Sequence, residues 1–135
     1  MHARLSIIDT SEQAHQPIYD STGRYAIVFN GEIFNFQSVR KELEAKGVVF
    51  RTNSDTEVLL YAYIHFGTSF LHKLNGFFAF AIHDKQTDEL FIACDRFGIK
   101  PLYYSRDEDY FFFGSELKTI LHFRSEEHTS ELQSP

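Results

Sequence analysis

One cysteine, no tryptophan and no long apolar run set the first limits on this sequence of 135 residues. Because Cys94 has no second cysteine to pair with, no intrachain disulfide can form, and a reducing compartment is expected. No apolar stretch approaches the roughly 20 residues that a membrane-spanning helix needs. The first five residues also lack the layout of a signal peptide. We therefore expect a cytoplasmic protein with no membrane partner.

Basic residues are outnumbered by acidic ones, 13 against 19, and the formal net charge is -6. A phosphate backbone is bound by clustered lysines and arginines, so this charge argues against a nucleic-acid partner. Gly31, Gly47 and Gly98 stand alone, so no glycine-rich phosphate loop is present. The seven histidines show no ligand spacing, and no metal site is expected.

Apolar residues are abundant, at 43%, and fifteen phenylalanines with seven tyrosines predict an aromatic core for one domain. The order of patterns, with helical segments between strand-like ones, predicts the α+β class. Residues 10–23 are interpreted as loop and turn. Strands are expected at 4–9, 24–29, 48–50, 76–83, 90–94, 102–105 and 110–114. Helices are expected after Asn35, at 55–66, around 69–74 and from Ser115.

The helix after Asn35 is indicated by Ile33, Phe36, Val39 and Leu43 at helical spacing. Asn35 can cap its start, and Gly47 suits its end. The next helix has capping-box spacing between Ser54 and Glu57.

Three groups that need polar partners, Asn30, Gly31 and Glu32, follow an apolar run directly. An Asn-Gly pair between apolar segments is typical of a hairpin turn. The helical spacing that follows favours instead a strand-to-helix junction, where glycine lets backbone N–H groups face a ligand. There, an asparagine amide beside a glycine N–H could form an oxyanion hole. Glu32 alone could equally be a solvated carboxylate near a helix start.

Arg4 and Asp55 are each open to a structural interpretation, as a surface cation and a helix cap. Taken with Glu32 they suggest more, because one guanidinium and two acids match the charges of a zwitterionic amino acid. The amide of Asn30 and the N–H of Gly31 would then face a side-chain carbonyl. Cys94 lies in an apolar strand pattern and is expected to be buried.

Six segments, in order, resemble the class II glutamine amidotransferase domain of glutamine-hydrolysing asparagine synthetases: 4–9, 30–36, 54–57, 76–82, 95–104 and 114–118. The resemblance covers nearly all of 2–123. It implies an N-terminal-nucleophile hydrolase-like αββα sandwich of antiparallel sheets between helix layers, here truncated at its N-terminal strands. It implies glutamine as substrate and hydrolysis to glutamate and ammonia.

The resemblance also implies roles for individual residues. Asn30 and Gly31 would form the oxyanion hole, and Glu32 would help to bind the substrate. The glutamine backbone groups would be held by Asp55 and by Arg4, Leu5, Ser6, Ile7 and Ile8. The family's nucleophile is a cysteine at the mature N-terminus whose own amine is the base. Cys94, in a strand, cannot replace it, so the chain is expected to be an internal fragment that is inactive alone.

The rest of the parent chain is implied to be a C-terminal synthetase domain, in which the ammonia aminates an aspartyl-adenylate. ATP and Mg²⁺ would serve that domain, and none is expected in this fragment. The parent chain could form a homodimer. Residues 124–135 resemble the in-frame translation of a sequencing adapter and are expected to be a disordered, non-native tail after a partial domain at 1–123.

Two other interpretations stay open. Amidotransferases that aminate a sugar phosphate or phosphoribosyl pyrophosphate share this domain, although the segments 4–9 and 95–101 favour an asparagine synthetase. A non-catalytic module that binds an amino acid is the second.

Overall fold

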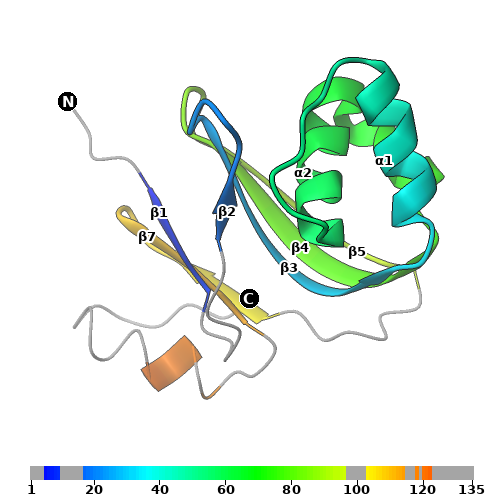
Figure 1. Ribbon diagram of the computed structural model, residues 1–135. Coiled ribbons are helices and arrows are strands. Elements are labelled where there is room, and N and C mark those ends of the chain that lie inside the picture. The colour runs from blue at the N-terminus through cyan, green and yellow to red at the C-terminus, as the bar shows by residue number, and fades with distance from the viewer. Residues whose placement is uncertain (1–4, 10–16, 97–102, 115–117, 119, 123–135) are drawn as a thin grey trace.

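Two β-sheets and a layer of helices make up the fold, described for residues 5–9, 17–96, 103–114, 118 and 120–122 of a computed structural model (Figure 1). Strands β2, β3, β4 and β5 form an antiparallel sheet in that order, and β1, β7 and β6 form a smaller one. The strands are β1 (Ser6–Asp9), β2 (Ile18–Tyr19), β3 (Tyr25–Ile33), β4 (Gly76–Asp84), β5 (Glu89–Cys94), β6 (Tyr103–Arg106) and β7 (Tyr110–Gly114). The helices are α1 (Phe36–Ala45), α2 (Asp55–Phe66) and the 3-10 helix η1 (Gly67–Lys73).

The larger sheet is buried on both faces. Helices α1 and α2 cover one face, and the smaller sheet lies against the other (Figure 1). Successive side chains of β3 therefore enter two different cores. Ile27 and Phe29 pack under the helices with Phe70 and Phe80, whereas Val28 packs between the sheets. This confirms the prediction of a central strand that is apolar on both sides.

Small side chains on the larger sheet allow the two sheets to approach each other. The core between them joins alanines of β3 and β4 to aromatic residues of β7 and aliphatic residues of β1. Its buried members are Leu5, Ile7, Ala26, Val28, Ala79, Ala81, Phe111 and Phe113. The residues 118 and 120–122 are helical and lie beyond the smaller sheet, on the side opposite α1 and α2 (Figure 1). The layers are thus helix, sheet, sheet, helix, as expected.

One strand pair departs from the expected antiparallel arrangement. β1 runs parallel to β7, with Ile7 opposite Phe111, while β6 and β7 form an antiparallel hairpin. A parallel pair needs a long connection between its strands. Here the whole larger sheet and the helices α1, α2 and η1 lie between β1 and β7 in the sequence.

Helix α2 has the predicted caps, but α1 has only one of them. The Ser54 side chain accepts a hydrogen bond from Glu57 N at 3.3 Å, and Gly67 is the C-cap of α2. Gly47 follows α1 at φ +99°, as predicted. Asn35 is at the N-cap position of α1 without a capping bond. Its side chain instead bonds Lys73 O at 2.6 Å and the N–H of Asn75 at 2.9 Å, which ties the start of α1 to the start of β4.

Two further expectations need correction. Residues 48–50 form no strand, because Val48 N donates to Leu43 O at the end of α1 and the segment stays in the helix layer. The loop expected at 10–23 contains β2, which pairs with β3. Helix α1 begins at Phe36, directly after Asn35, as expected. Among the described residues, no helix is long and apolar enough to cross a membrane.

Candidate functional site

Asn30, Gly31 and Glu32 lie inside strand β3, so they form neither the hairpin turn nor the strand-to-helix junction that the sequence suggested. All three are paired with β4, opposite Ala79, Phe78 and Phe77. The strand ends only at Ile33, and Phe34 and Asn35 make the turn into α1.

Gly31 is required by the backbone itself. Its φ is +137°, which side chains other than hydrogen disfavour, and a Cβ built on it would lie 2.2 Å from the carbonyl oxygen of Phe77. Gly76, opposite Ile33, is equally crowded, since its Cβ would lie 2.1 Å from Glu32 O. Strands β3 and β4 therefore approach closely at this end of the sheet.

The backbone N–H of Gly31 is directed to the open edge of β3. Peptide groups alternate along a strand, and the Tyr25 carbonyl and the Ile33 N–H both bond groups on the β2 side of β3. Gly31 is an even number of residues from both Tyr25 and Ile33, so its N–H points to the same side of β3. Since β2 pairs only with residues 26 and 27, no strand of the described sheet covers this edge beside Gly31. An N–H at this position can meet a ligand.

Asp55 lies at the same edge. Its Oδ2 accepts a hydrogen bond from Ile33 N at 3.3 Å, which joins the first residue of α2 to the last residue of β3. Asp55 is half-buried and Glu32 is exposed. By alternation, the side chains of Asn30 and Glu32 project from the face of β3 that is turned to the smaller sheet. The structure thus brings Asp55 to the segment of Asn30, Gly31 and Glu32.

Strand β1 contacts β3. The side chains of Leu5 and Ile7 are buried in the core between the sheets. Ser6 is exposed, and its N–H donates to Asp109 O at 2.8 Å beside β7. Ile8 pairs with Phe112. Because peptide groups alternate, those of Leu5 and Ile7 point to the free edge of the smaller sheet. Arg4 lies outside the described residues.

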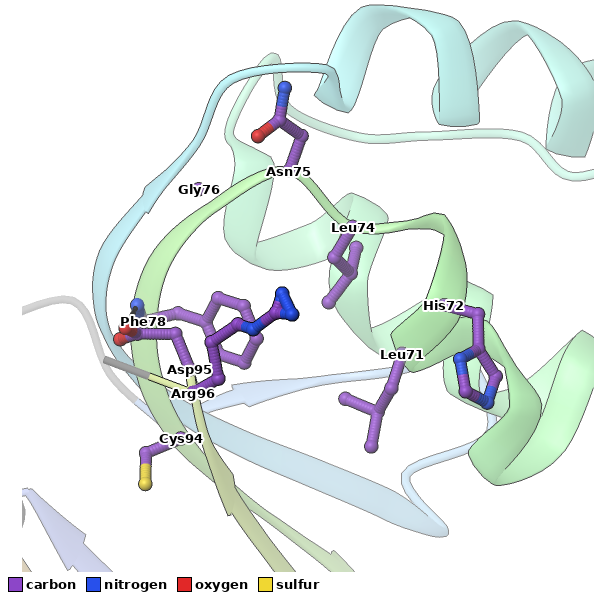
Figure 2. A pocket seen from close by; sticks show the side chains of 9 residues that line it. All are labelled: Leu71, His72, Leu74, Asn75, Gly76, Phe78, Cys94, Asp95 and Arg96. Atoms are coloured by element: carbon purple, nitrogen blue, oxygen red, sulfur yellow. Dashed lines mark hydrogen bonds between the residues drawn. The ribbon is translucent and has the colours of Figure 1, made fainter. Parts of the chain in front are cut away.

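A cavity of about 490 Å³ lies beside the end of β3 that contains Gly31, but on the helix side of the larger sheet (Figure 2). It lies between η1, the start of β4 and the end of β5. Among the described residues that line it, none is a predicted site residue. Its lining residues are Leu71, His72, Leu74, Asn75, Gly76, Phe78, Cys94, Asp95 and Arg96.

Cys94 is exposed, so the expectation that it is buried was wrong. It is the last residue of β5, where the apolar alternation ends, and its side chain points away from Leu71 and His72 (Figure 2). The register places Asn30, Ala79 and Cys94 opposite one another across three strands. The Cys94 thiol therefore belongs to the same face as the Asn30 amide, with a strand between them.

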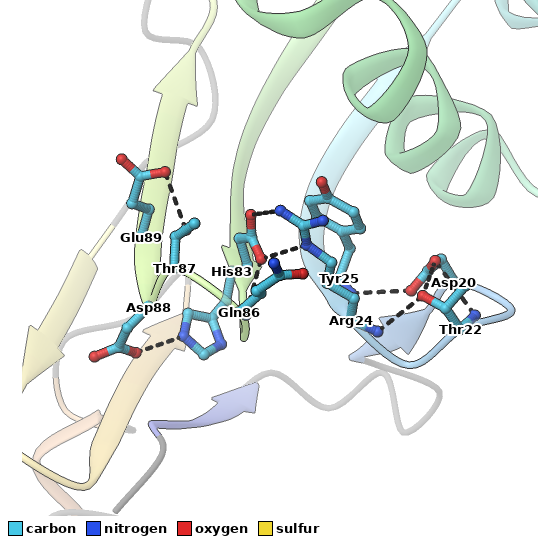
Figure 3. A network of polar contacts seen from close by, with 10 residues as sticks. Asp20, Thr22, Arg24, Tyr25, His83, Gln86, Thr87, Asp88 and Glu89 are labelled. Carbon is cyan, nitrogen blue, oxygen red and sulfur yellow. Dashed lines mark hydrogen bonds and ion pairs between the residues drawn. The ribbon is translucent and has the colours of Figure 1, made fainter. Parts of the chain in front are cut away.

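A polar network around Arg24 and Tyr25 lies at the opposite end of the β3–β4 ladder from Gly31 (Figure 3). Asp84 is opposite Tyr25, and the Arg24 guanidinium donates to both of its oxygens at 2.8 Å. These hydrogen bonds lower the pKa of Asp84 to about 2. This pair ties strand ends together. Within the described part of the chain, no three His, Cys, Asp or Glu side chains gather to hold a metal ion.

The fold is that of the N-terminal-nucleophile amidotransferases. A solved structure of the glutamine phosphoribosylpyrophosphate amidotransferase of Bacillus subtilis matches 74% of this chain and 24% of its own, with a TM-score of 0.57 and 29% identity. The chain belongs to the family of the glutamine amidotransferase domain, which matches residues 1–134.

Within this family the chain is similar to asparagine synthetases. It is 50% identical over 118 residues to the glutamine-hydrolysing asparagine synthetase 1 of Bacillus subtilis strain 168, and 44% identical over 122 residues to asparagine synthetase 3 of that strain. These matches cover 87% and 89% of this chain. The chain spans only 18% and 20% of the length of these relatives.

The hydrogen-bond partners of Glu57, close to Asp55, differ from those that the sequence predicted. The spacing of Ser54 and Glu57 predicted a capping box, in which the Glu57 carboxylate would accept from Ser54 N. Ser54 N donates instead to the Thr52 hydroxyl at 3.2 Å. The Glu57 carboxylate accepts from Arg51 N and Thr52 N, outside the helix. The spacing of Ser54 and Glu57 therefore indicated that the Glu57 carboxylate binds backbone N–H groups near the start of α2, but it did not specify which ones.

Proposed function

We propose that this chain is the glutaminase part of a glutamine-dependent asparagine synthetase. Similarity to the asparagine synthetases supports this function over nearly the whole chain. The observation that carries it is the meeting of Asp55 with the end of β3, through the 3.3 Å bond to Ile33 N. This bond gathers a carboxylate, an asparagine amide and an uncovered edge of β3 into one region.

The proposed reaction is hydrolysis of the glutamine side-chain amide. The α-amine of an N-terminal cysteine takes the proton of the thiol, the thiolate attacks the amide carbonyl, and the protonated amine returns that proton to the nitrogen that leaves as ammonia. Water then hydrolyses the thioester, which releases glutamate and restores the thiol. Asn30 Nδ2 and Gly31 N–H would donate to the oxyanion that forms during the attack. Cys94 is unsuited to be this nucleophile, since its amino group is part of a peptide bond within β5. We infer that the nucleophile comes from parent sequence beyond this chain, and we expect the 135 residues alone to release no glutamate.

The substrate's charged groups would be held by residues around the open edge of β3. Arg4 would pair with the α-carboxylate of glutamine, and Asp55 and Glu32 with its ammonium group. Within residues 5–8, the main chain of Leu5 and Ile7 would supply further hydrogen bonds, since their peptide groups face the free edge of the smaller sheet, whereas Ser6 N–H is already bonded to Asp109 O. Peptide groups suit this task, because the buried Leu5 and Ile7 side chains leave only the backbone available.

The remainder of the parent protein would use the ammonia. We propose that a C-terminal domain binds ATP and Mg²⁺, activates aspartate as an adenylate and transfers ammonia to it. ATP and Mg²⁺ enter no step assigned to the present residues. A cytoplasmic location and a homodimer are part of the same proposal.

An amidotransferase that acts on phosphoribosyl pyrophosphate or a sugar phosphate is the second candidate. The similarity to the phosphoribosylpyrophosphate amidotransferase, at 29% identity, favours it to a lesser degree. Supplying the full-length protein with glutamine and either aspartate plus ATP or phosphoribosyl pyrophosphate separates the two. Asparagine formation supports the first candidate, and phosphoribosylamine formation supports the second.

Substitution of the charged residues tests the assignment of the glutamine site. In the full-length protein, Arg4→Ala and Asp55→Ala should each raise the KM for glutamine roughly 10- to 100-fold, because each removes a hydrogen bond to a charged group. The kcat should change little. Glutamate release measured against glutamine concentration gives both constants. Glu44→Ala, which removes an exposed acid from α1, is the control. An unchanged KM in both variants would contradict the assignment.

A further inference from the structure

Glu57 is a buried acid in the first turn of α2, and the proposed chemistry does not use it. Its exposed fraction is 3%. A carboxylate at such a position is costly unless hydrogen bonds replace the lost water. Three donors supply them: Oε2 accepts from Arg51 N at 2.9 Å, and Oε1 accepts from Thr52 N at 2.8 Å and from Thr52 Oγ1 at 2.7 Å. All three donors belong to the loop that precedes the helix.

The same network continues through the loop to the residue before Asp55. Thr52 Oγ1 lies 3.1 Å from Ser54 Oγ and accepts from Ser54 N at 3.2 Å. Ser54 Oγ in turn accepts from Glu57 N at 3.3 Å. The backbone before and after Asp55 is therefore bound to one buried carboxylate, directly or through Thr52 and Ser54. The position of the Asp55 Cα depends on this carboxylate.

Asp55 itself is only lightly held. Its Oδ2 has the bond to Ile33 N, at the long distance of 3.3 Å. Within the described residues, no hydrogen bond engages Oδ1. A side chain with one long bond and one available oxygen can accept a ligand, but its direction must then be set by its backbone.

We propose that Glu57 is a positioning residue, which holds the loop 51–54 so that the Asp55 carboxylate is directed to the ammonium group of the substrate. This inference rests on the proposed glutaminase function. It predicts that loss of the Glu57 carboxylate weakens substrate binding through Asp55 and leaves the chemical step unchanged.

The substitution Glu57→Gln tests the proposal in the full-length protein. A glutamine keeps one acceptor oxygen but sets its NH₂ group against a backbone N–H of the loop. We expect the KM for glutamine to rise about tenfold with kcat within about twofold of the wild type, since one charge-assisted bond is lost. Val39→Ala, a cavity variant in the buried face of α1, is the control for general destabilisation and should leave the KM unchanged.

A double-mutant cycle separates positioning from a merely structural role. If Glu57 acts through Asp55, then Glu57→Gln should add less than about twofold to the KM of Asp55→Asn. Effects that multiply in the double variant, or a KM for Glu57→Gln equal to that of the wild type, would overturn the proposal. Hydrogen exchange of the Arg51 and Thr52 amides should accelerate in Glu57→Gln but not in Val39→Ala, and unchanged exchange would also overturn it.

Failure of the underlying function has a different signature. If Asp55→Asn leaves the KM unchanged while Glu57→Gln still accelerates exchange at Thr52, then the loop is held as described but Asp55 does not bind glutamine. That result would overturn the assignment of Asp55, and with it the positioning role. A KM raised by Asp55→Asn but not by Glu57→Gln would overturn the positioning role alone.

Discussion

At the scale of the residue, Gly31 has two separate reasons to be glycine, its backbone conformation and its closeness to Phe77 O. We expect Gly31→Ala to lower the free energy of unfolding by at least about 2 kcal/mol, because strain at positive φ and the close carbonyl act together. Gly23→Ala is the matched control. Gly23 also has positive φ, at +77°, but nothing lies within 4 Å of its Cβ, so the expected cost is only about 1 kcal/mol.

Chemical unfolding followed by circular dichroism measures both variants. Equal losses in Gly31→Ala and Gly23→Ala would show that φ alone matters at Gly31 and that the approach of β4 does not. The sequence suggested that Gly31 exposes an N–H to a ligand. It could not indicate the contact with Phe77, because that contact depends on the pairing of β3 with a strand more than forty residues away.

At the scale of the element, Arg24 and Asp84 join the start of β3 to the end of β4, and this ion pair makes stability depend on pH (Figure 3). The pKa of Asp84 falls from 3.8 to about 2 on folding, chiefly through the hydrogen bonds from Arg24. A carboxyl whose pKa is lower in the folded state binds protons more readily when unfolded. Its contribution to stability is therefore complete above about pH 4 and is lost as the pH falls toward 2.

The variant Asp84→Asn tests this dependence. We expect it to be less stable than the wild type at pH 6 and to lose less stability between pH 4 and pH 2, since the amide that replaces the carboxyl does not titrate. Unfolding in urea at several pH values gives the two curves. Parallel curves for the wild type and the variant over this range would mean that the pair contributes nothing to the pH dependence.

Elements defined by local signals were predicted well, and those defined by distant partners were not. Ser54 and Gly67 specify the ends of α2, and the alternation in 76–94 specifies the β4–β5 hairpin, because caps and turns are local. Residues 48–50 look like a short strand, but no strand in the described part of the chain pairs with them. Asn30 and Gly31 look like a turn, yet β4 supplies partners that keep the strand extended. A strand forms only where a neighbouring strand bonds its backbone groups, and the sequence does not show which distant segment that neighbour is.

At the scale of the whole molecule, the arrangement of the candidate site depends on two sheets held at a fixed separation. β1 carries the proposed substrate-binding main chain, and it is supported from between the sheets by Phe111, in the same core as Leu5 and Ile7. Phe112 is equally buried but belongs to the opposite face of β7. Substitutions at these two neighbouring phenylalanines can therefore distinguish an effect on the position of β1 from a general loss of stability.

We expect Phe111→Leu and Phe112→Leu to cost similar amounts of stability, on the order of 1–2 kcal/mol, because both remove buried aromatic volume. Only Phe111→Leu should also raise the KM for glutamine, by about tenfold, since a small shift of β1 misplaces the peptide groups proposed to hold the substrate. Thermal unfolding and steady-state kinetics of the full-length variants measure the two effects. A KM raised equally by both variants would mean that the smaller sheet acts as one rigid layer, and that the contacts between the sheets do not specifically position β1.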